Sequence, residues 1–236
     1  MVPEYKISTP FFEFGPKAYL YGGELLALMK RIDSFAEKYD MDVIADVQTV
    51  DLRLIAENTS ERIHVYAQHM DSIPVGRGMG TILPEAVKAA GAVGVMLNHA
   101  ERKLSLDEIE KAIKRADGVG LATIVCADTE EEIRAVAEMR PNIVVAEPSE
   151  LIGTGIAVGR EYVDACIGLV RSVDPSIMVL PSAGISCGAD CYNIIMAGAD
   201  GSGSSSGICK APDPAAMAEE MMAAVRRAYD AREGKR

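Results

Sequence analysis

The chain has 236 residues, of which 49% are hydrophobic and 25% charged, a balance typical of one globular domain over residues 1–236. The formal net charge of −11 repels nucleic-acid backbones and anionic lipid surfaces, so we expect no nucleic acid and no membrane as partners. No segment approaches the ~20 apolar residues that span a bilayer, and residues 1–14 contain no apolar run of signal-peptide length.

Short apolar runs alternate with longer segments of helical spacing from one end of the chain to the other. The predicted strands are Phe11–Phe14, Val43–Asp46, Ile63–Ala67, Gly94–Leu97, Ala122–Cys126, Ile143–Ala146, Met178–Leu180 and Gly201–Gly203. The predicted helices are Glu24–Lys38, Thr49–Glu57, Leu83–Ala90, Leu106–Arg115, Glu130–Met139, Glu161–Ser172, Ala189–Ala197 and Pro214–Ala231. Eight such pairs in this length favour an α/β fold with a single closed (β/α)8 TIM barrel over an open doubly wound sheet.

Three of the predicted helices carry start signals. Ser105 and Thr129 each precede acidic residues, and Asp213 stands before Pro214, so each start offers a side-chain oxygen to free N–H groups. The segment GSGSSSG at 201–207 has the composition of a flexible loop. Its place between the last strand and the last helix instead favours phosphate binding, which is common there in barrels. The charged tail at about 232–236 is expected to fray.

Reactive side chains follow several of the predicted strands. Lys17 comes after the first strand, His99 after the fourth and Glu147 after the sixth, while small Gly and Ser residues occupy 182–186 and 204–207. In a barrel the carboxyl ends of the strands carry the catalytic groups. An ammonium group, an imidazole and a carboxylate beside small loops indicate a site that moves protons on a phosphorylated substrate.

The remaining histidines and cysteines give no competing site. His64, His69 and His99 lack metal-ligand spacing and no two cysteines form a CxxC pair, so we expect no metal, and no cofactor is predicted either. His64 and His69 are interpreted as structural residues. Five cysteines at irregular spacing favour free thiols and a cytoplasmic location over a disulfide framework.

Four segments resemble the motifs of one enzyme family, in that family's order. They are Tyr66–His69 (YAQH), Leu97–Arg102 (LNHAER), Ala146–Gly155 (AEPSELIGTG) and Ala183–Ser186 (AGIS). From about residue 11 to 225 the chain resembles triosephosphate isomerase, particularly the short archaeal-type branch of that family. The Glu-Pro pair followed by Ile-Gly-Thr-Gly is the most specific of these motifs.

The resemblance implies a role for each matching residue. Glu147 would be the base, His99 the electrophile and Lys17 the cation beside the substrate phosphate; triosephosphate isomerase is itself a standard example of this acid-base arrangement. The residues implied to bind substrate or phosphate are Gly155, Ser186, Ser205, Ser206 and Gly207, and the supporting residues are Asn98 and Glu101. Residues 149–155 would form a mobile lid. The implied reaction interconverts dihydroxyacetone phosphate and glyceraldehyde 3-phosphate, a step of glycolysis and gluconeogenesis.

The chain departs from the family at two places. The family's first strand ends in Asn-x-Lys, whose asparagine touches the substrate, whereas this chain has Gly15-Pro16-Lys17. The eighth strand has Ser202-Gly203-Ser204 where bulkier apolar residues are expected, which would enlarge the pocket. An isomerase for another short sugar phosphate, such as a tetrulose phosphate, is therefore an alternative. A second alternative, from another class, is a noncatalytic barrel that binds a phosphorylated metabolite.

The family generally assembles through the loop after the third strand. The corresponding segment here is Asp71–Thr81, with Gly76-Arg-Gly-Met-Gly80 at its centre. The resemblance thus implies a homodimer or a homotetramer, and the sequence does not choose between them.

Overall fold

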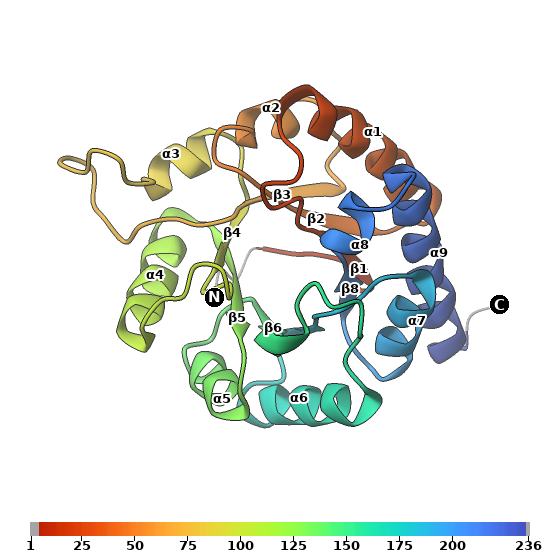
Figure 1. The fold of residues 1–236 in the computed structure, drawn as a ribbon. Coiled ribbons are helices and arrows are strands. Elements are labelled where there is room, and N and C mark those ends of the chain that lie inside the picture. The colour runs from red at the N-terminus through yellow and green to blue at the C-terminus, as the bar shows by residue number, and fades with distance from the viewer. Residues whose placement is uncertain (1–4, 235–236) are drawn as a thin grey trace.

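A ring of eight parallel strands surrounded by helices forms the molecule, which we describe from a computed structural model over residues 5–234 (Figure 1). The strands are β1 (Phe11–Phe14), β2 (Asp42–Val47), β3 (Ile63–Ala67), β4 (Gly94–Leu97), β5 (Ala122–Ala127), β6 (Ile143–Ala146), β7 (Met178–Pro181) and β8 (Gly201–Gly203). Their order around the sheet is β7-β6-β5-β4-β3-β2-β1-β8. The predicted barrel is confirmed, and each predicted strand is present with its bounds shifted by at most one residue at either end.

The ring closes between β7 and β8 through one residue rather than a ladder of paired residues. The backbone N–H of Asp200 donates to the carbonyl oxygen of Val179 at 3.1 Å. In return, the Val179 N–H donates to Oδ2 of the Asp200 side chain at 2.8 Å. An aspartate just before a three-residue strand therefore supplies the acceptor that a longer strand would provide from its backbone.

Alternation along each strand separates the inside of the barrel from its outer layer. In β1, Phe12 and Phe14 belong to the core between strands and helices, whereas Phe11 points into the barrel. Strand side chains alternate between faces, so Glu13 shares the inner side with Phe11. The inner core consists of Phe11, Ile44, Tyr66, Met96, Ala122, Ile124, Cys126, Ile143, Val145 and Leu180. These apolar side chains fill the interior of the barrel and support the polar residues at the carboxyl ends of the strands.

The helices are α1 (Gly22–Lys38), α2 (Leu52–Ala56), α3 (Pro84–Ala89), α4 (Leu106–Val119), α5 (Glu130–Glu138), α6 (Arg160–Val173), α7 (Gly188–Met196), α8 (Ser206–Cys209) and α9 (Pro214–Arg232), with a 3-10 turn η1 (Ser149–Leu151). The predicted caps are present: the side chains of Ser105, Thr129 and Asp213 each accept a backbone N–H of the helix that follows.

Two helices, α4 and α2, differ from the prediction by more than two residues at one end, and one further helix was not predicted. Helix α4 continues to Val119 and ends at Gly120, whose φ of 74° is the left-handed conformation that glycine adopts easily. Helix α2 begins only at Leu52, because the chain first turns so that the Asp51 N–H donates to the Gln48 carbonyl oxygen at 2.9 Å. The short helix α8 was not predicted, since Ser and Gly favour loops over helices.

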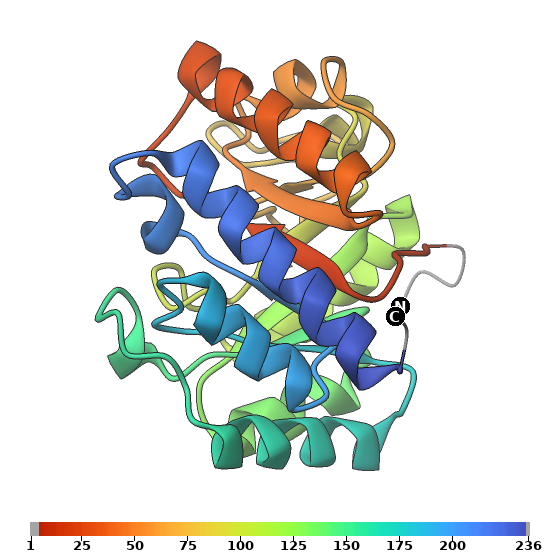
Figure 2. The ribbon, with the colours of Figure 1, turned by 90° about the vertical axis from the view of Figure 1, so that its right-hand side faces the viewer.

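Two loops stand out from the ring. The loop between β3 and α3 projects far from the barrel in Figure 1, and it contains the predicted assembly segment 71–81. Seen from the side in Figure 2, the loop after β6 and helix α8 lie at one end of the barrel, and the carboxyl-terminal end of α9 lies at the other. Within the described residues, no helix is both long enough and apolar enough to cross a membrane. Residues 235–236 of the predicted charged tail lie outside the described part of the chain.

Candidate active site

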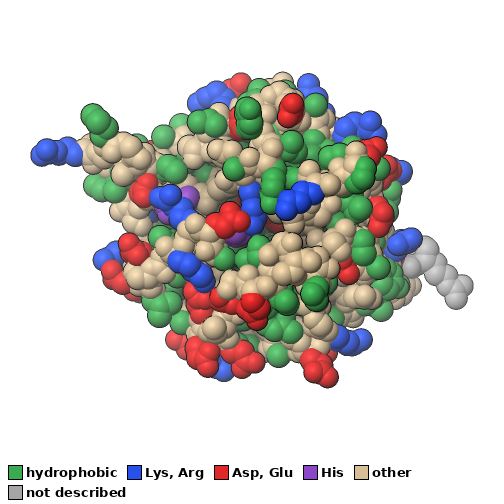
Figure 3. Space-filling model, in the orientation of Figure 1, with side chains coloured by type: hydrophobic (Ala, Val, Ile, Leu, Met, Phe, Trp, Pro, Cys, Tyr) green, Lys and Arg blue, Asp and Glu red, His purple; other side chains and the backbone are tan. Residues whose placement is uncertain are grey.

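A cavity of about 380 Å³ opens at the carboxyl ends of the strands. Figure 3 shows the hollow near the middle of this face, with histidine side chains inside it and charged side chains around it. Of the predicted site residues, Lys17, His99, Glu101, Glu147, Ser205 and Ser206 line the cavity. The other four do not line the cavity: Asn98, Ser186 and Gly207 each adjoin a lining residue in the sequence, and Gly155 lies two residues beyond Gly153.

Glu147 stands directly after β6 at the cavity wall. Its backbone N–H donates to the Ala127 carbonyl oxygen at 2.9 Å, which continues the pairing of β6 with β5 up to the site. Burial raises the pKa of the Glu147 carboxyl to about 7, a shift that Lys17 opposes and Glu13 adds to. A carboxylate with a pKa near neutrality is matched to work as a general base.

His99 faces Glu147 across the cavity, with its Nε2 atom 3.6 Å from Oε2 of the carboxylate. The other ring nitrogen, Nδ1, accepts the backbone N–H of Glu101 at 3.1 Å, so the neutral ring carries its proton on Nε2. Burial and the nearby charge of Lys17 lower the pKa of His99 to about 4. The imidazole is therefore neutral at physiological pH and presents an N–H donor to the cavity.

Lys17 brings a positive charge to the same cavity from the loop after β1. Its Nζ donates to Oε1 of Glu101 at 2.8 Å, and this contact lowers the pKa of the Glu101 carboxyl. The Lys17 backbone has a φ of 49°, a conformation that costs free energy for residues other than glycine. A hydrogen bond from Nε2 of Gln68 to the Lys17 carbonyl oxygen, at 3.0 Å, holds this backbone in place.

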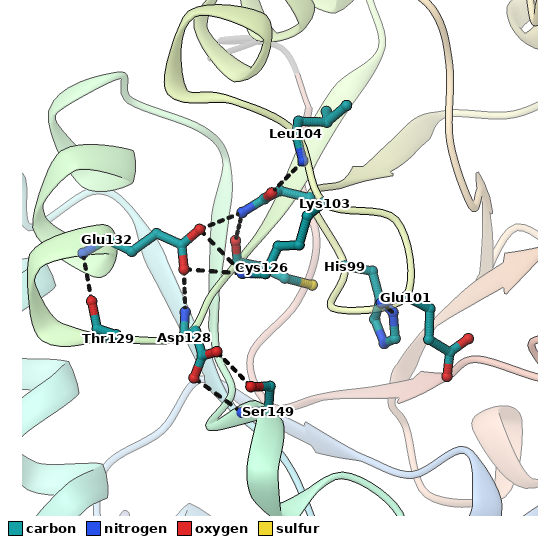
Figure 4. Close-up of polar contacts among 10 residues, drawn as sticks. His99, Glu101, Lys103, Leu104, Cys126, Asp128, Thr129, Glu132 and Ser149 are labelled. Carbon is teal, nitrogen blue, oxygen red and sulfur yellow. Dashed lines mark hydrogen bonds and ion pairs between the residues drawn. The ribbon is translucent and has the colours of Figure 1, made fainter.

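Asn98 fixes the loop that carries His99, although it does not reach the cavity. Its buried amide donates to the Cys126 carbonyl oxygen and to Oε1 of Glu132, both at 2.8 Å, and its Oδ1 accepts the Leu104 N–H at 2.9 Å. Figure 4 shows this network beside His99, with Glu132 at its centre. The turn after β4 is thus tied to β5 and α5, and its backbone cannot move without breaking buried hydrogen bonds.

The loop after β6 covers one side of the cavity. Asp128 accepts hydrogen bonds from the backbone N–H and from the hydroxyl of Ser149, at 3.0 and 2.6 Å, and so anchors the start of the loop (Figure 4). Gly153 lines the cavity, whereas Gly155 is exposed beyond it. The loop then passes so close to Gly184 that a Cβ there would lie 1.9 Å from the Ile156 carbonyl oxygen.

The loops after β7 and β8 form the end of the cavity nearest α8. Ser205 Oγ is buried with no hydrogen-bond partner among the described residues, and Ser206 starts α8, where the first backbone N–H groups have no partner within the helix. Gly207 packs tightly, since a Cβ there would lie 2.8 Å from the Ile185 carbonyl oxygen. The N–H of Ser186 is already donated to Oδ2 of Asp190 at 2.8 Å.

Comparison with known proteins identifies the family of this chain. The family model described as triosephosphate isomerase matches residues 15–221. The chain belongs to the triosephosphate isomerase family. It is 41% identical to the triosephosphate isomerase of Methanobacterium bryantii, over 87% of this chain and 92% of that protein. The enzymes of Sulfolobus acidocaldarius and Methanocaldococcus jannaschii share 36% and 38% identity, over 92% and 80% of this chain and 95% and 87% of their own lengths.

Family membership confirms the resemblance in the motifs and makes the protein an enzyme, an aldose–ketose isomerase. Within the described residues, no group of three or more His, Cys, Asp or Glu side chains is arranged to hold a metal ion. His64 and His69 instead lie near single carboxylates, at 3.6 Å from Asp42 and 3.4 Å from Asp71.

Among the cavity-wall residues that were not predicted as site residues, three are polar and lie near Lys17. Glu13 in β1, Asp46 in β2 and Gln68 after β3 line the cavity beside Lys17. A signal was present for the two acids: each is a charged residue in a mostly apolar strand and points inward, two residues or fewer from the strand's end. An inward-pointing charge near the carboxyl end of a barrel strand is a candidate site residue.

Proposed function

We propose that this protein interconverts dihydroxyacetone phosphate and glyceraldehyde 3-phosphate through an enediolate, with Glu147, His99 and Lys17 in the three reacting roles. The observation that carries the proposal is the 3.6 Å approach of His99 Nε2 to Glu147 Oε2 within one cavity. A base and a neutral N–H donor this close can act on adjacent atoms of one small substrate. Membership of the triosephosphate isomerase family supports the same reaction.

In the proposed reaction, the Glu147 carboxylate removes a proton from the carbon next to the substrate carbonyl. The electrons move onto the carbonyl oxygen and form an enediolate, which the Nε2–H of His99 stabilises by hydrogen bonding. The same proton then returns from Glu147 to the neighbouring carbon, and the hydroxyl proton shifts between the two oxygens. Lys17 offsets the negative charge of substrate and enediolate.

The phosphate of the substrate would bind at the end of the cavity formed by the loops after β7 and β8. The first N–H groups of α8, at Ser206 and Gly207, and the unpaired hydroxyl of Ser205 support this assignment. Gly155 and Ser186 are proposed to join them when the lid moves, which for Ser186 requires its N–H to leave Asp190. Closure of residues 149–155 would exclude water from the enediolate.

We also propose assembly into a homodimer or homotetramer through the loop 71–81. Val75 and Met79 on this loop have exposed fractions of 70% and 104%, and apolar side chains so exposed favour burial against a second copy. Size-exclusion chromatography with light scattering distinguishes the two assemblies from a monomer. A cytoplasmic location is proposed because all five cysteines are free thiols.

The experiment that tests the proposed function is a substrate panel. Three- and four-carbon ketose and aldose phosphates are assayed for isomerisation, and the triose phosphates are expected to give the highest kcat/KM. Faster turnover of a tetrulose phosphate would favour the alternative substrate class. Thermal protection by phosphorylated ligands without turnover of any sugar would favour a noncatalytic binding barrel.

A further inference from the structure

Two buried carboxyl groups, Glu13 and Asp46, lie together in the wall of the cavity beside Lys17. They come from the neighbouring strands β1 and β2, and their exposed fractions are 8% and 1%. The described reaction uses neither group. Charged residues this buried are rarely kept in a protein unless they are paired or functional, so their presence at the cavity wall needs an explanation.

The Glu13 side chain occupies space that two glycines leave open. A Cβ at Gly15 would lie 2.9 Å from Oε1 of Glu13, so a side chain at position 15 would have to displace this carboxyl group. A Cβ at Gly203 would lie 2.8 Å from Oε2, but it would meet the Glu13 backbone carbonyl oxygen first, at 2.0 Å. The missing asparagine at position 15 therefore makes room for the Glu13 carboxyl group, whereas the glycine in β8 makes room for the backbone of β1 as well. On this side, the glycine in β8 does not enlarge the cavity.

The two carboxyl groups are expected to hold one proton between them. Neither oxygen of Asp46 has a hydrogen-bond donor among the described residues, so no neighbouring donor stabilises the ionised form of Asp46. Burial raises the pKa of both groups, and two adjacent buried carboxylates cannot both ionise readily. Because the pKa of Asp46 is raised well above its usual range, by burial first and by the charge of Glu13 second, we expect Asp46 to keep the proton and Glu13 to be the ionised member of the pair.

The titratable groups that face this pair come from several elements. They are Lys17 after β1, Tyr5 before β1, Tyr66 in β3, Cys126 in β5, Glu147 after β6 and Cys209 in α8. Only Lys17 among them is a cation, and it offsets the charge of Glu13 and lowers the pKa of that carboxyl. The charge of Glu13 in turn raises the pKa of Glu147. The pair is therefore electrically connected to the proposed base.

We propose that Glu13, held by the protonated side chain of Asp46, contacts the bound sugar phosphate and accepts a hydrogen bond from one of its hydroxyl groups. This contact would replace that of the family's asparagine, because the Glu13 carboxyl group lies 2.9 Å from the place that the Cβ of a residue at position 15 would take. The inference rests on the proposed function, since it requires substrate to bind in the cavity lined by Lys17, His99 and Glu147.

Exchange of the carboxyl group for the family's amide tests the contact directly. Glu13→Ala is expected to lower kcat/KM about 10- to 100-fold, the effect of losing a hydrogen bond to a charged group. Gly15→Asn alone collides with Glu13 and is expected to lower activity too. Combining Glu13→Ala with Gly15→Asn should recover about tenfold or more of the loss, because the new amide reaches the vacated space.

Single variants separate this contact from a structural role. Asp46→Asn keeps a donor for Glu13, so it should lower kcat/KM less than Asp46→Leu, which removes the donor. Glu13→Gln removes the negative charge, so it should lower the pKa of Glu147 and move the acid limb of the kcat/KM profile to lower pH. Asp42→Asn, at the opposite end of β2, is the charge-matched control and should leave that limb in place.

The outcomes distinguish this inference from the proposed function. Parent-like kcat/KM in Glu13→Ala, together with a large loss in Glu147→Asp, would overturn the Glu13 contact and leave the isomerase assignment intact. Parent-like activity in Glu147→Asp would instead overturn the proposed base. If Glu13→Ala does not fold, as judged by circular dichroism and thermal melting, the near-isosteric Glu13→Gln carries the test, and an unmoved acid limb rejects the inference.

Discussion

His99 Nε2 lies 3.6 Å from Glu147 Oε2, and the two residues follow β4 and β6, which flank β5 in the barrel. Two backbone hydrogen bonds hold the two residues in this position. The Glu101 N–H fixes the histidine ring through Nδ1, and the Glu147 N–H extends β6 along β5. A carboxylate that binds protons near neutrality thus meets an imidazole that is neutral throughout the physiological range.

Shortening the base by one methylene tests its position. Glu147→Asp withdraws the carboxylate by about 1 Å from the substrate carbon, and misplacement of this size costs about 100-fold in rate. We expect kcat to fall by that factor or more while the melting temperature stays close to that of the parent. Steady-state kinetics with both triose phosphates measures the effect, and an unchanged kcat would contradict the assignment.

Replacing the imidazole tests the electrophile. His99→Gln retains a donor but changes its position, so the enediolate loses stabilisation that the ground-state substrate barely uses. We expect kcat to fall about 100-fold or more with a smaller change in KM. Loss confined to KM would indicate that His99 only binds substrate.

Removing the ammonium group tests the electrostatic role of Lys17. Lys17→Ala should raise KM and lower kcat together, since the cation faces both the bound anion and the enediolate. Glu101→Gln is the matched control, because it removes the partner of Lys17 and keeps the cation. We expect Glu101→Gln to have the smaller effect; equal losses in both variants would show that the ion pair, rather than the cation, matters.

The pH dependence of kcat/KM follows from the base. Since the pKa of Glu147 is raised to about 7, the carboxylate is ionised above that pH and protonated below it. The profile should therefore be flat above pH 7 and should fall about tenfold per pH unit below it. His99, with its pKa lowered to about 4, adds no step in this range. A profile flat down to pH 5 would contradict the raised pKa.

The protein should lose stability when the buried side-chain amide of Asn98, which holds the loop that carries His99, is removed. Asn98→Ala deletes three hydrogen bonds, leaves Glu132 and the Cys126 carbonyl oxygen without this donor, and puts alanine at a φ of 58°. We expect a loss of about 2–4 kcal/mol in unfolding free energy, measured by urea titration. Thr129→Ala, which removes only a helix cap of α5, should cost about 1 kcal/mol.

The barrel was predictable because seven of its eight strands are short, mostly apolar runs bounded by charges, turns or glycines, whereas β8 is a Gly-Ser-Gly segment. Helix α8 was not predicted, because it has only four residues, Ser206–Cys209, and begins with Ser and Gly, which favour loops. The three residues proposed to react were predicted from their places at strand ends, and all three line one cavity. Glu13 and Asp46 were missed because their significance lies in packing: only the coordinates bring the Glu13 carboxyl against the bare backbone at Gly15 and Gly203.

Deuterium exchange at the reacting carbon tests most directly whether Glu147 moves the substrate proton. Dihydroxyacetone phosphate is incubated with the protein in D2O, and incorporation is followed by NMR for the parent and for Glu147→Gln, whose amide keeps the shape but cannot act as a base. We predict rapid incorporation and isomerisation with the parent, and loss of both by several orders of magnitude with Glu147→Gln. Exchange at the same rate in both proteins, or none with the parent, would contradict the account.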